Sequence, residues 1–158
     1  MKPIVVFTNF WDANAIVKKG SFNCCFNETS ECQHCNLELE TYEVSSIALG
    51  IPHSYKIPAL TCISRINCFL PTRELLFDYK EDKDWDKYRT KYRKLLVERK
   101  EAIESWLKRL ESDKVYFLCC WEITSKTVHC HRELLFNVFC STAIWKDKAM
   151  WRYRSGKK

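Results

Sequence analysis

Three adjacent polar residues, Cys130-His131-Arg132, open an apolar segment in the last quarter of the chain. A thiol, an imidazole and a guanidinium together supply a nucleophile, an acid–base group and an anion-binding group. Upstream, the apolar run VYFLCCW ends at Trp121 and is followed by Glu122. If Cys130 begins a helix, the unpaired N–H groups and the dipole of its first turn favour an anion at the same place. The pattern therefore predicts catalytic roles for Glu122, Cys130 and His131, and anion binding by Arg132.

A structural interpretation of the same residues stays open. Cysteine is a common small buried residue, and Arg132 in the first turn of a helix could simply pair with Glu122. Under the functional interpretation, Glu122 orients His131, binds a ribose hydroxyl or pairs with Arg132.

Two apolar runs predict the strands that position these groups. Residues 114–121 are apolar on both faces, which is typical of a central parallel strand covered by helices on each side. The run PIVVFTNF at residues 3–10 indicates a second buried strand, and residues 133–143 indicate a helix. Polar groups at the carboxyl end of a strand, before a helix, form the usual ligand site of open α/β sheets. We therefore expect Asn9 and Asp12, at the end of the first strand, to neighbour the site.

The segments between these two runs have weaker secondary-structure signals. Residues 41–49 alternate weakly and predict a strand, and a short strand is expected within residues 62–69. From residue 84 to residue 110 there is no Gly or Pro, and Asp82 or Asp84 could cap a helix start. One long helix or two helices with a kink would both fit. Its apolar face comprises Trp85, Tyr88, Tyr92, Leu95, Leu96, Ile103, Trp106, Leu107 and Leu110.

The segment LCCWE…HCHRELL resembles the signature of the prokaryotic and phage family named domain of unknown function 488. In that family a strand ends in Cys, an aromatic residue and Glu, and a Cys-His-Arg triplet then opens a helix. Residues 120–122 and 130–132 occupy those positions, and Tyr88 and Tyr92 match a Tyr-x-x-x-Tyr pattern in the preceding helix. The resemblance implies a Rossmann-like α/β fold, a three-layer sandwich with a mostly parallel sheet, and a pocket. Tyr92 and Trp121 complete the expected ligand-binding residues.

The resemblance covers about residues 79–140, and VSSIALGIP also resembles the segment after the family's first strand. Two departures concern the rest of the chain. The irregular, Cys-rich insertion at residues 18–39 has no recognised counterpart in the family. The Asp-x-Arg that follows the second strand in many members is missing.

The insertion contains a second candidate site, in NCCFNETSECQHCNLE. Cys32 and Cys35 have the two-residue spacing of a metal knuckle, and Cys24 and Cys25 precede them. These four thiolates, or three of them with His34, His53, Cys62 or Cys68, could bind zinc and stabilise a segment with little apolar content. Only one C-x-x-C pair is present, however, and adjacent cysteines seldom bind one ion. Unliganded cysteines and a disulfide therefore stay open beside zinc.

Charge is concentrated at the carboxyl end of the chain. The net charge is +6, and residues 145–158 hold six Lys or Arg and one Asp. We therefore expect one α/β domain at residues 1–144 and a basic aromatic tail at residues 145–158. The tail could be merely solvated, or its cations and its Trp and Tyr rings could contact the phosphates and bases of a nucleic acid.

Several classes are excluded or disfavoured by composition. With 46% hydrophobic and 29% charged residues the chain is typical of a globular protein, and it has no apolar run of membrane-spanning length. The first 20 residues do not resemble a signal peptide. We expect a cytoplasmic location, or the host cytoplasm for a viral protein. With three Gly and no G-x-G-x-x-G or Walker pattern, a conventional dinucleotide or P-loop site is disfavoured.

Three functions fit these patterns, and the last of them is a thiol redox protein with Cys32 and Cys35 as its C-x-x-C pair. It ranks behind the other two, because this pair neither follows a predicted strand nor opens a helix as a thioredoxin motif would. The first is binding, with or without processing, of a nucleotide-like or other anionic molecule at the Cys-His-Arg helix start. The second is a non-catalytic phage or accessory-genome module that binds nucleic acid or a host protein and is stabilised by zinc. Whether the chain is an enzyme, and its oligomeric state, are left undecided.

Overall fold

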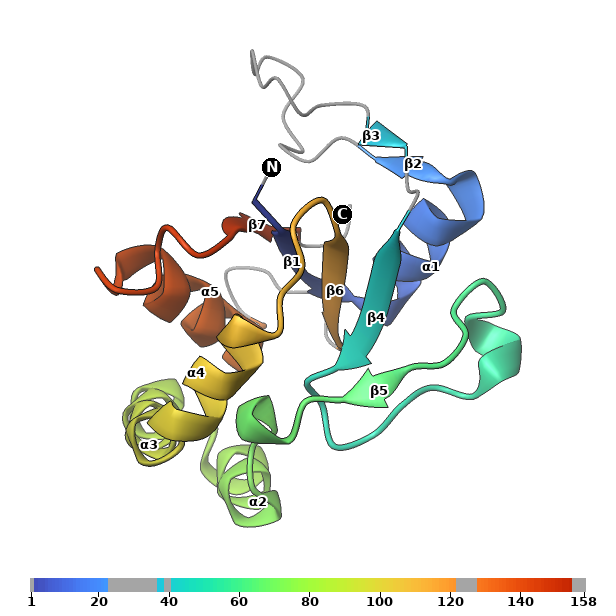
Figure 1. Ribbon diagram of the computed structural model, residues 1–158. Helices are drawn as coiled ribbons and strands as arrows, with labels where there is room; N and C mark the ends of the chain where they lie inside the picture. Colours follow the sequence, from blue (N-terminus) through green and yellow to red (C-terminus); the bar gives the residue numbers. More distant parts are fainter. Residues whose placement is uncertain (1, 23–36, 39–40, 122–127, 155–158) are drawn as a thin grey trace.

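The computed structural model describes residues 2–22, 37–38, 41–121 and 128–154. A five-stranded parallel sheet in the order β5-β4-β6-β1-β7 forms the centre of the molecule (Figure 1). A two-stranded antiparallel ribbon, β2-β3, lies apart from it. The strands are β1 (Ile4–Asn9), β2 (Ser21–Phe22), β3 (Leu37–Glu38), β4 (Tyr42–Ser46), β5 (Ser64–Arg65), β6 (Val115–Cys120) and β7 (Met150–Tyr153).

The two central strands are the two apolar runs of the sequence. Every residue of β1 and of β6 is buried, and their register runs from Ile4 opposite Val115 to Asn9 opposite Cys120. Strands that are apolar on both faces need cover on both sides. This register brings the carboxyl ends of β1, β4 and β6 to the same edge of the sheet.

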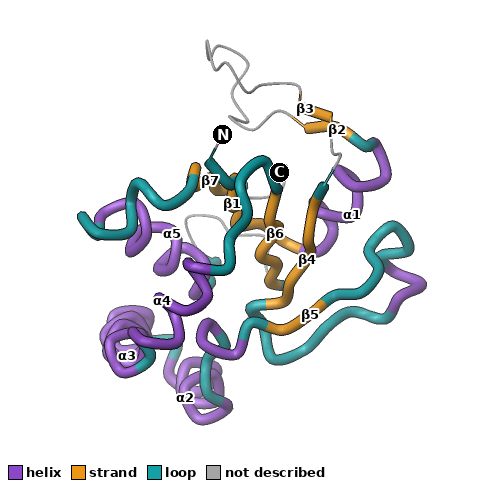
Figure 2. The backbone as a smooth tube through the Cα atoms, viewed as in Figure 1, coloured by secondary structure: helices purple, strands orange, loops and turns teal. Residues whose placement is uncertain are grey.

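Helices cover both faces of the sheet (Figures 1 and 2). One buried cluster joins α1 to residues such as Val6 and Phe117. The other cluster joins the remaining helices to residues such as Phe7 and Leu118. The predicted Rossmann-like α/β sandwich is therefore confirmed. The helices are α1 (Phe10–Lys19), α2 (Arg73–Asp82), α3 (Trp85–Glu98), α4 (Lys100–Lys108) and α5 (His131–Ser141), with short 3-10 turns η1 (Ser54–Lys56) and η2 (Asn67–Phe69).

The long helical pattern is divided into two helices at Arg99. Asp84 caps α3 by accepting a hydrogen bond from the backbone N–H of Lys87, as one of the two predicted caps. At the junction, the Arg99 guanidinium donates to the carbonyl oxygens of Cys68 and Leu70. The side chain at the break therefore binds the loop that precedes α2.

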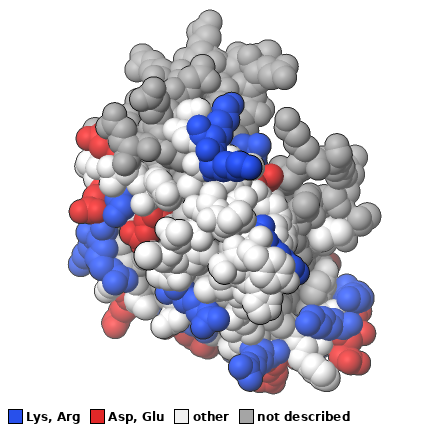
Figure 3. Space-filling model, turned by 90° about the vertical axis from the view of Figure 1, so that its right-hand side faces the viewer, with Lys and Arg blue, Asp and Glu red and all other residues white. Residues whose placement is uncertain are grey.

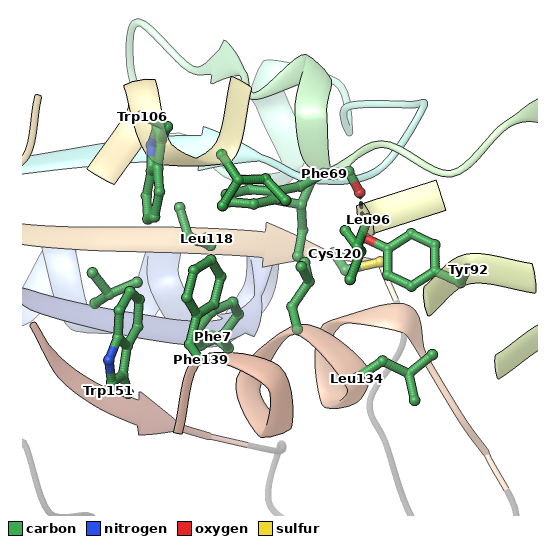
Figure 4. Close-up of a cluster of buried hydrophobic side chains, with 14 of the residues drawn as sticks. Phe7, Phe69, Tyr92, Leu96, Trp106, Leu118, Cys120, Leu134, Phe139 and Trp151 are labelled. Carbon is green, nitrogen blue, oxygen red and sulfur yellow. Dashed lines mark hydrogen bonds between the residues drawn. The ribbon is translucent and has the colours of Figure 1, made fainter. Parts of the chain in front are cut away.

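The larger core cluster is aromatic and holds α3, α4 and α5 against the sheet (Figure 4). Phe139 of α5 stacks on Trp151 at a ring distance of 4.3 Å, and Trp106 of α4 meets Phe69 edge-on at 4.9 Å. Tyr92 of α3 is fully buried, and its hydroxyl donates to the Phe69 carbonyl over 2.7 Å. These contacts fix the helices that surround the candidate site.

The carboxyl-terminal segment differs from the expected tail. Residues 150–153 are strand β7, which pairs in parallel with β1, and Trp145 and Trp151 are buried in the core. Alternating apolar residues explain this placement, because Trp151 faces the core while Arg152 is partly exposed. The two Trp rings are therefore enclosed by protein and do not offer a surface for stacking on bases.

The described cations are not gathered into one patch on the face shown in Figure 3. Lys and Arg side chains lie around an uncharged centre, with acidic side chains beside several of them. None of the helices in the described ranges is long and apolar enough to cross a membrane.

Candidate functional site

The candidate site forms where β6 ends and α5 begins. Cys120 is the last residue of β6, Cys130 is the N-cap residue of α5, and His131 is the first residue of that helix. The Cys130 and Cys120 Sγ atoms are 3.1 Å apart, and Cys130 Sγ lies 3.6 Å from His131 Nδ1. All three side chains are at most 4% exposed. Two thiols and an imidazole therefore share one buried position at the carboxyl edge of the sheet.

His131 is oriented by a backbone carbonyl from another element. Its Nε2 lies at hydrogen-bond distance from the carbonyl oxygen of Ile47, just after β4. Because a carbonyl oxygen only accepts, Nε2 carries the proton and Nδ1 faces the Cys130 sulfur. The edge of the Tyr92 ring packs against the imidazole, with the ring centres 5.3 Å apart. This arrangement sets which nitrogen can exchange a proton with the thiol.

The surroundings of Cys130 favour its thiolate. Burial alone raises the pKa of this thiol, but the hydrogen bond with Cys120, the charge and hydrogen bond of His131, and the charge of Arg132 all lower it. The balance places the pKa of Cys130 well below that of an ordinary thiol. A thiolate in this position is a strong nucleophile and metal ligand.

Arg132 lies behind the cluster, toward β1. It is fully buried, and its guanidinium donates to the Thr8 carbonyl over 2.9 Å. The Tyr153 ring of β7 lies 5.5 Å from the guanidinium carbon. Burial lowers the pKa of Arg132, but the neighbouring Cys130 and Tyr153 outweigh it and raise the pKa overall. The guanidinium is therefore a fixed buried cation that stabilises negative charge on Cys130.

A cavity of about 510 Å³ opens in front of the cluster. It reaches Cys120 and His131 at its inner end, and the exposed cations Arg73 and Lys80 of α2 lie at its other side. The Trp121 indole N–H donates to the Gly50 carbonyl over 3.0 Å and forms part of the wall. The lining residues are Ala48, Leu49, Gly50, Pro71, Arg73, Leu76, Phe77, Lys80, Cys120, Trp121 and His131.

A family comparison covers this whole region. The family model described as the active DUF488-N3 subclade, DUF488-N3a, matches residues 42–142, which extend from the start of β4 past the end of α5. The chain belongs to the DUF488 family. A search of curated proteins and a search of solved structures each found no match.

The DUF488 signature residues lie at the cavity and behind it. Trp121 and His131 line the cavity, whereas Cys130 and Arg132 lie deeper and are not among its lining residues. Glu122, predicted as a catalytic residue, lies outside the described residues. So do Cys24, Cys25, Cys32 and Cys35, the predicted zinc ligands.

Three other predicted ligand-binding residues have structural partners in this DUF488 domain. Asn9 caps α1 by accepting from the Asp12 backbone N–H over 2.8 Å, and its amide donates to the Asp12 carboxylate over 2.9 Å. Asp12 also lies 3.8 Å from the Arg154 guanidinium. Tyr92 is enclosed by the core, and burial raises the pKa of its hydroxyl well above the ordinary value. None of the three lines the cavity.

Three lining residues with a charged or thiol side chain were not predicted as site residues. Cys120 is part of the family signature but was not assigned a role, because a buried strand cysteine is more often a core residue. Arg73 and Lys80 belong to α2, which the prolines before it obscured. The signal for this helix was Thr72, whose hydroxyl accepts from the Leu75 backbone N–H as the N-cap. Leu75, Leu76 and Tyr79 follow it at helical spacing.

The cluster also has the composition of a metal site. The donor atoms of Cys120, Cys130 and His131 all lie within 4.8 Å of one another. Two thiolates and an imidazole suit zinc, and three protein ligands beside a cavity leave a fourth position open. The Ile47 carbonyl bonded to Nε2 is the type of partner that orients a metal-binding histidine. These residues could hold a metal; zinc at the amino-terminal cysteines stays a prediction.

Proposed function

We propose that this DUF488 domain binds a small anionic molecule of the nucleotide-like class in the cavity and processes it at the cluster of Cys120, Cys130 and His131. The observation that supports this most directly is the set of residues that line the cavity. Its inner end reaches a thiol and an imidazole, and its outer side carries two cations. Ligand and reactive groups would therefore meet at the carboxyl edge of a parallel sheet, where open α/β folds bind ligands.

The charge of the lining favours an anion. Arg73 and Lys80 face the cavity from α2, and among the described residues none that lines it is acidic. Arg73 is also the first residue of that helix, where unpaired backbone N–H groups add to the positive potential. A phosphate or carboxylate near Arg73 and Lys80 would be held by charge-assisted hydrogen bonds.

The apolar part of the lining favours a ligand with a planar ring. Phe77 is 63% exposed and Trp121 is 39% exposed, and both contribute to the cavity wall. Exposed aromatic rings beside cations suit a molecule that combines a base with a phosphate, because every base offers a face for stacking. A nucleotide-like ligand therefore uses both parts of the lining.

The cluster supplies groups for a reaction on the bound molecule. Cys120 lines the cavity, and its sulfur is 3.1 Å from Cys130, whose thiolate is stabilised by His131 and Arg132. The paired thiols provide a nucleophile with an adjacent proton acceptor, and His131 provides acid–base exchange at Nδ1. The matching subclade is described as active, which agrees with a catalytic role.

Binding can be tested by calorimetric titration with inorganic phosphate, adenosine monophosphate and adenosine triphosphate. We expect at least one nucleotide to bind more tightly than phosphate. The double variant Arg73→Ala/Lys80→Ala should weaken that binding by about 30-fold, since each charge-assisted bond contributes about 1–2 kcal/mol. The matched control is Arg65→Ala/Arg109→Ala, which removes two exposed cations from a different cavity. Equal weakening in both double variants would refute the assignment to this cavity.

A further inference from the structure

Adjacent cysteines at the end of β6 have opposite environments. Cys119 packs in the cluster beneath α1, whereas Cys120 packs in the cluster of α3 and α5. The alternation of side chains along a strand explains this separation. Of these two cysteines, Cys120 lies beside the Cys130 thiol. Figure 4 shows the Cys120 side chain among the core residues of that face. The strand therefore presents one thiol to the cluster and keeps its neighbour away.

The two sulfur atoms are already close to bonding distance. Their separation of 3.1 Å exceeds a disulfide bond of about 2.05 Å by about 1 Å, which small side-chain rotations can supply. Cys130 is the N-cap residue of α5, in extended backbone conformation, and it makes no side-chain capping bond to the helix. Its sulfur can therefore move toward Cys120 without breaking a cap.

A small oxidant has a route to this pair. Both thiols are nearly buried, at 3% and 4% exposure, so large thiol reagents have little access. Cys120, however, lines a cavity whose lining also includes the exposed residues Gly50 and Trp121. A molecule of the size of hydrogen peroxide can enter such a cavity and meet a sulfur atom at its inner end.

We propose that Cys120 and Cys130 form a reversible oxidative modification site, in which a small peroxide converts the two thiols into a disulfide. A thiolate of the pair attacks one peroxide oxygen, the O–O bond breaks, and the products are a sulfenic acid and hydroxide. The second thiol then attacks the sulfenic sulfur, and the S–O bond breaks with release of water. Each sulfur loses one hydrogen, and the peroxide is reduced to two water molecules.

Oxidation would change the cluster at three points. The thiolate disappears, the interaction between Cys130 and His131 Nδ1 is lost, and Arg132 loses the neighbouring Cys130 anion. The dithiol and the disulfide are therefore an active and an inactive form of the proposed site. The modification itself does not depend on which ligand the cavity binds.

Peptide mapping tests the proposal directly. Trypsin cleaves after Lys114, Lys126 and Arg132, so Cys120 and Cys130 fall in separate peptides, 115–126 and 127–132. The reduced full-length protein is treated with a small excess of hydrogen peroxide, its remaining thiols are alkylated, and the digest is analysed without reductant. We expect the two peptides to be linked, with a loss of about 2 Da that dithiothreitol reverses.

Two variants separate this pair from the neighbouring thiol. Cys119→Ser should retain the link, and Cys120→Ser should lose it, with both folds checked by circular dichroism. A link that persists in Cys120→Ser would assign it to Cys119 and overturn the proposal. So would stable oxidation of Cys130 to sulfinic acid in the wild type without any linked peptide. Nucleotide titration of the reduced protein is measured separately, so that failure of the disulfide and failure of ligand binding are distinguishable.

Discussion

Two cavities of similar size lie on the same face of the sheet. The first, of about 510 Å³, reaches Cys120 and His131 at the carboxyl end of β6. The second, of about 540 Å³, lies near Tyr116 and Glu43, at the amino ends of β6 and β4, and contains Arg65 and Arg109. Each cavity thus has two cations and an aromatic wall. They differ in the residues that the sheet supplies: Cys120 at the carboxyl end of β6 in the first cavity, and Tyr116 and Glu43 at the amino ends of β6 and β4 in the second.

A cysteine in each region shows the effect of that difference. Cys68 lines the second cavity, where burial raises the pKa of its thiol more than a backbone hydrogen bond and the charges of Arg99 and Arg109 lower it. Cys130 is more deeply buried, yet its hydrogen bonds with Cys120 and His131 and the charges of His131 and Arg132 bring its pKa below the ordinary value. One backbone hydrogen bond and two nearby cations are therefore insufficient to lower the pKa of Cys68. Cys130 has side-chain partners within hydrogen-bond distance and adjacent charges together, which the strand end and the helix start supply.

The largest expected effect is on the free energy of unfolding. It comes from comparing Arg132, which is buried behind the first cavity, with Arg109, which lines the second. Arg132→Leu removes a fully buried guanidinium and leaves the buried Thr8 carbonyl without this donor. We expect the free energy of unfolding in urea to fall by about 3 kcal/mol. Arg109→Leu, at an exposed position, should change it by less than about 0.5 kcal/mol. Similar losses in both variants would mean that Arg132 has no special structural role.

An effect of intermediate size is expected from the thiols of Cys130 and Cys68, which should change how stability depends on pH. Because the pKa of Cys130 is lowered by folding, the unfolded state binds more protons and stability rises with pH until the ordinary thiol pKa is passed. Its contribution is present above the unfolded pKa and is lost as pH falls through the folded pKa. For Cys68 the folded pKa is raised, so its contribution is present below the unfolded pKa and declines above it.

Unfolding measured across a pH series checks these signs. Cys130→Ser should flatten the rise on the acidic side of the ordinary thiol pKa. Cys68→Ser should instead remove a decline on the alkaline side. Curves for both variants that run parallel to the wild type would show that neither thiol changes its pKa on folding.

The smallest expected effect concerns the wall of the first cavity. Trp121→Phe keeps a ring in the wall but removes the hydrogen bond to the Gly50 carbonyl. Since one neutral hydrogen bond contributes about 1 kcal/mol or less, nucleotide affinity should fall by about threefold. Trp106→Phe, in the second cavity, should leave the affinity unchanged within error. Calorimetric titration of both variants measures the difference.

The sequence predicted the elements whose signal is local. The largely apolar, fully buried runs at β1 and β6, and the helical spacing across α3 and α4, depend on burial patterns within a single segment. The strand β7 was missed because it is short, basic and at the sheet edge, where only Trp151 needs to be buried. The helix α1 was also missed, although Asn9 caps its start and Gly20 ends it in left-handed conformation.

The site was predictable in part for the same reason. Cys130, His131 and Arg132 are consecutive, so their meeting at a helix start follows from the chain itself. The Arg73 and Lys80 side of the cavity depends on how α2 packs beside residues more than 40 positions away. The burial of Arg132 could not be predicted from the sequence, because an arginine in the first turn of a helix can point toward solvent or toward the sheet with the same local geometry. Only the parallel register of β1 and β6 makes the Thr8 carbonyl its partner.

The position of β1 has a consequence for how the chain reaches this structure. Ile4 pairs with Val115 on one side and with Met150 on the other, so β1 is synthesised long before both of its neighbours in the sheet. During translation its hydrogen-bonding edges stay without these partners until residues 115–153 have left the ribosome. Contacts of such long sequence separation fold slowly and leave an aggregation-prone strand exposed. Nascent chains of this protein are therefore expected to need protection until the sheet can close around β1.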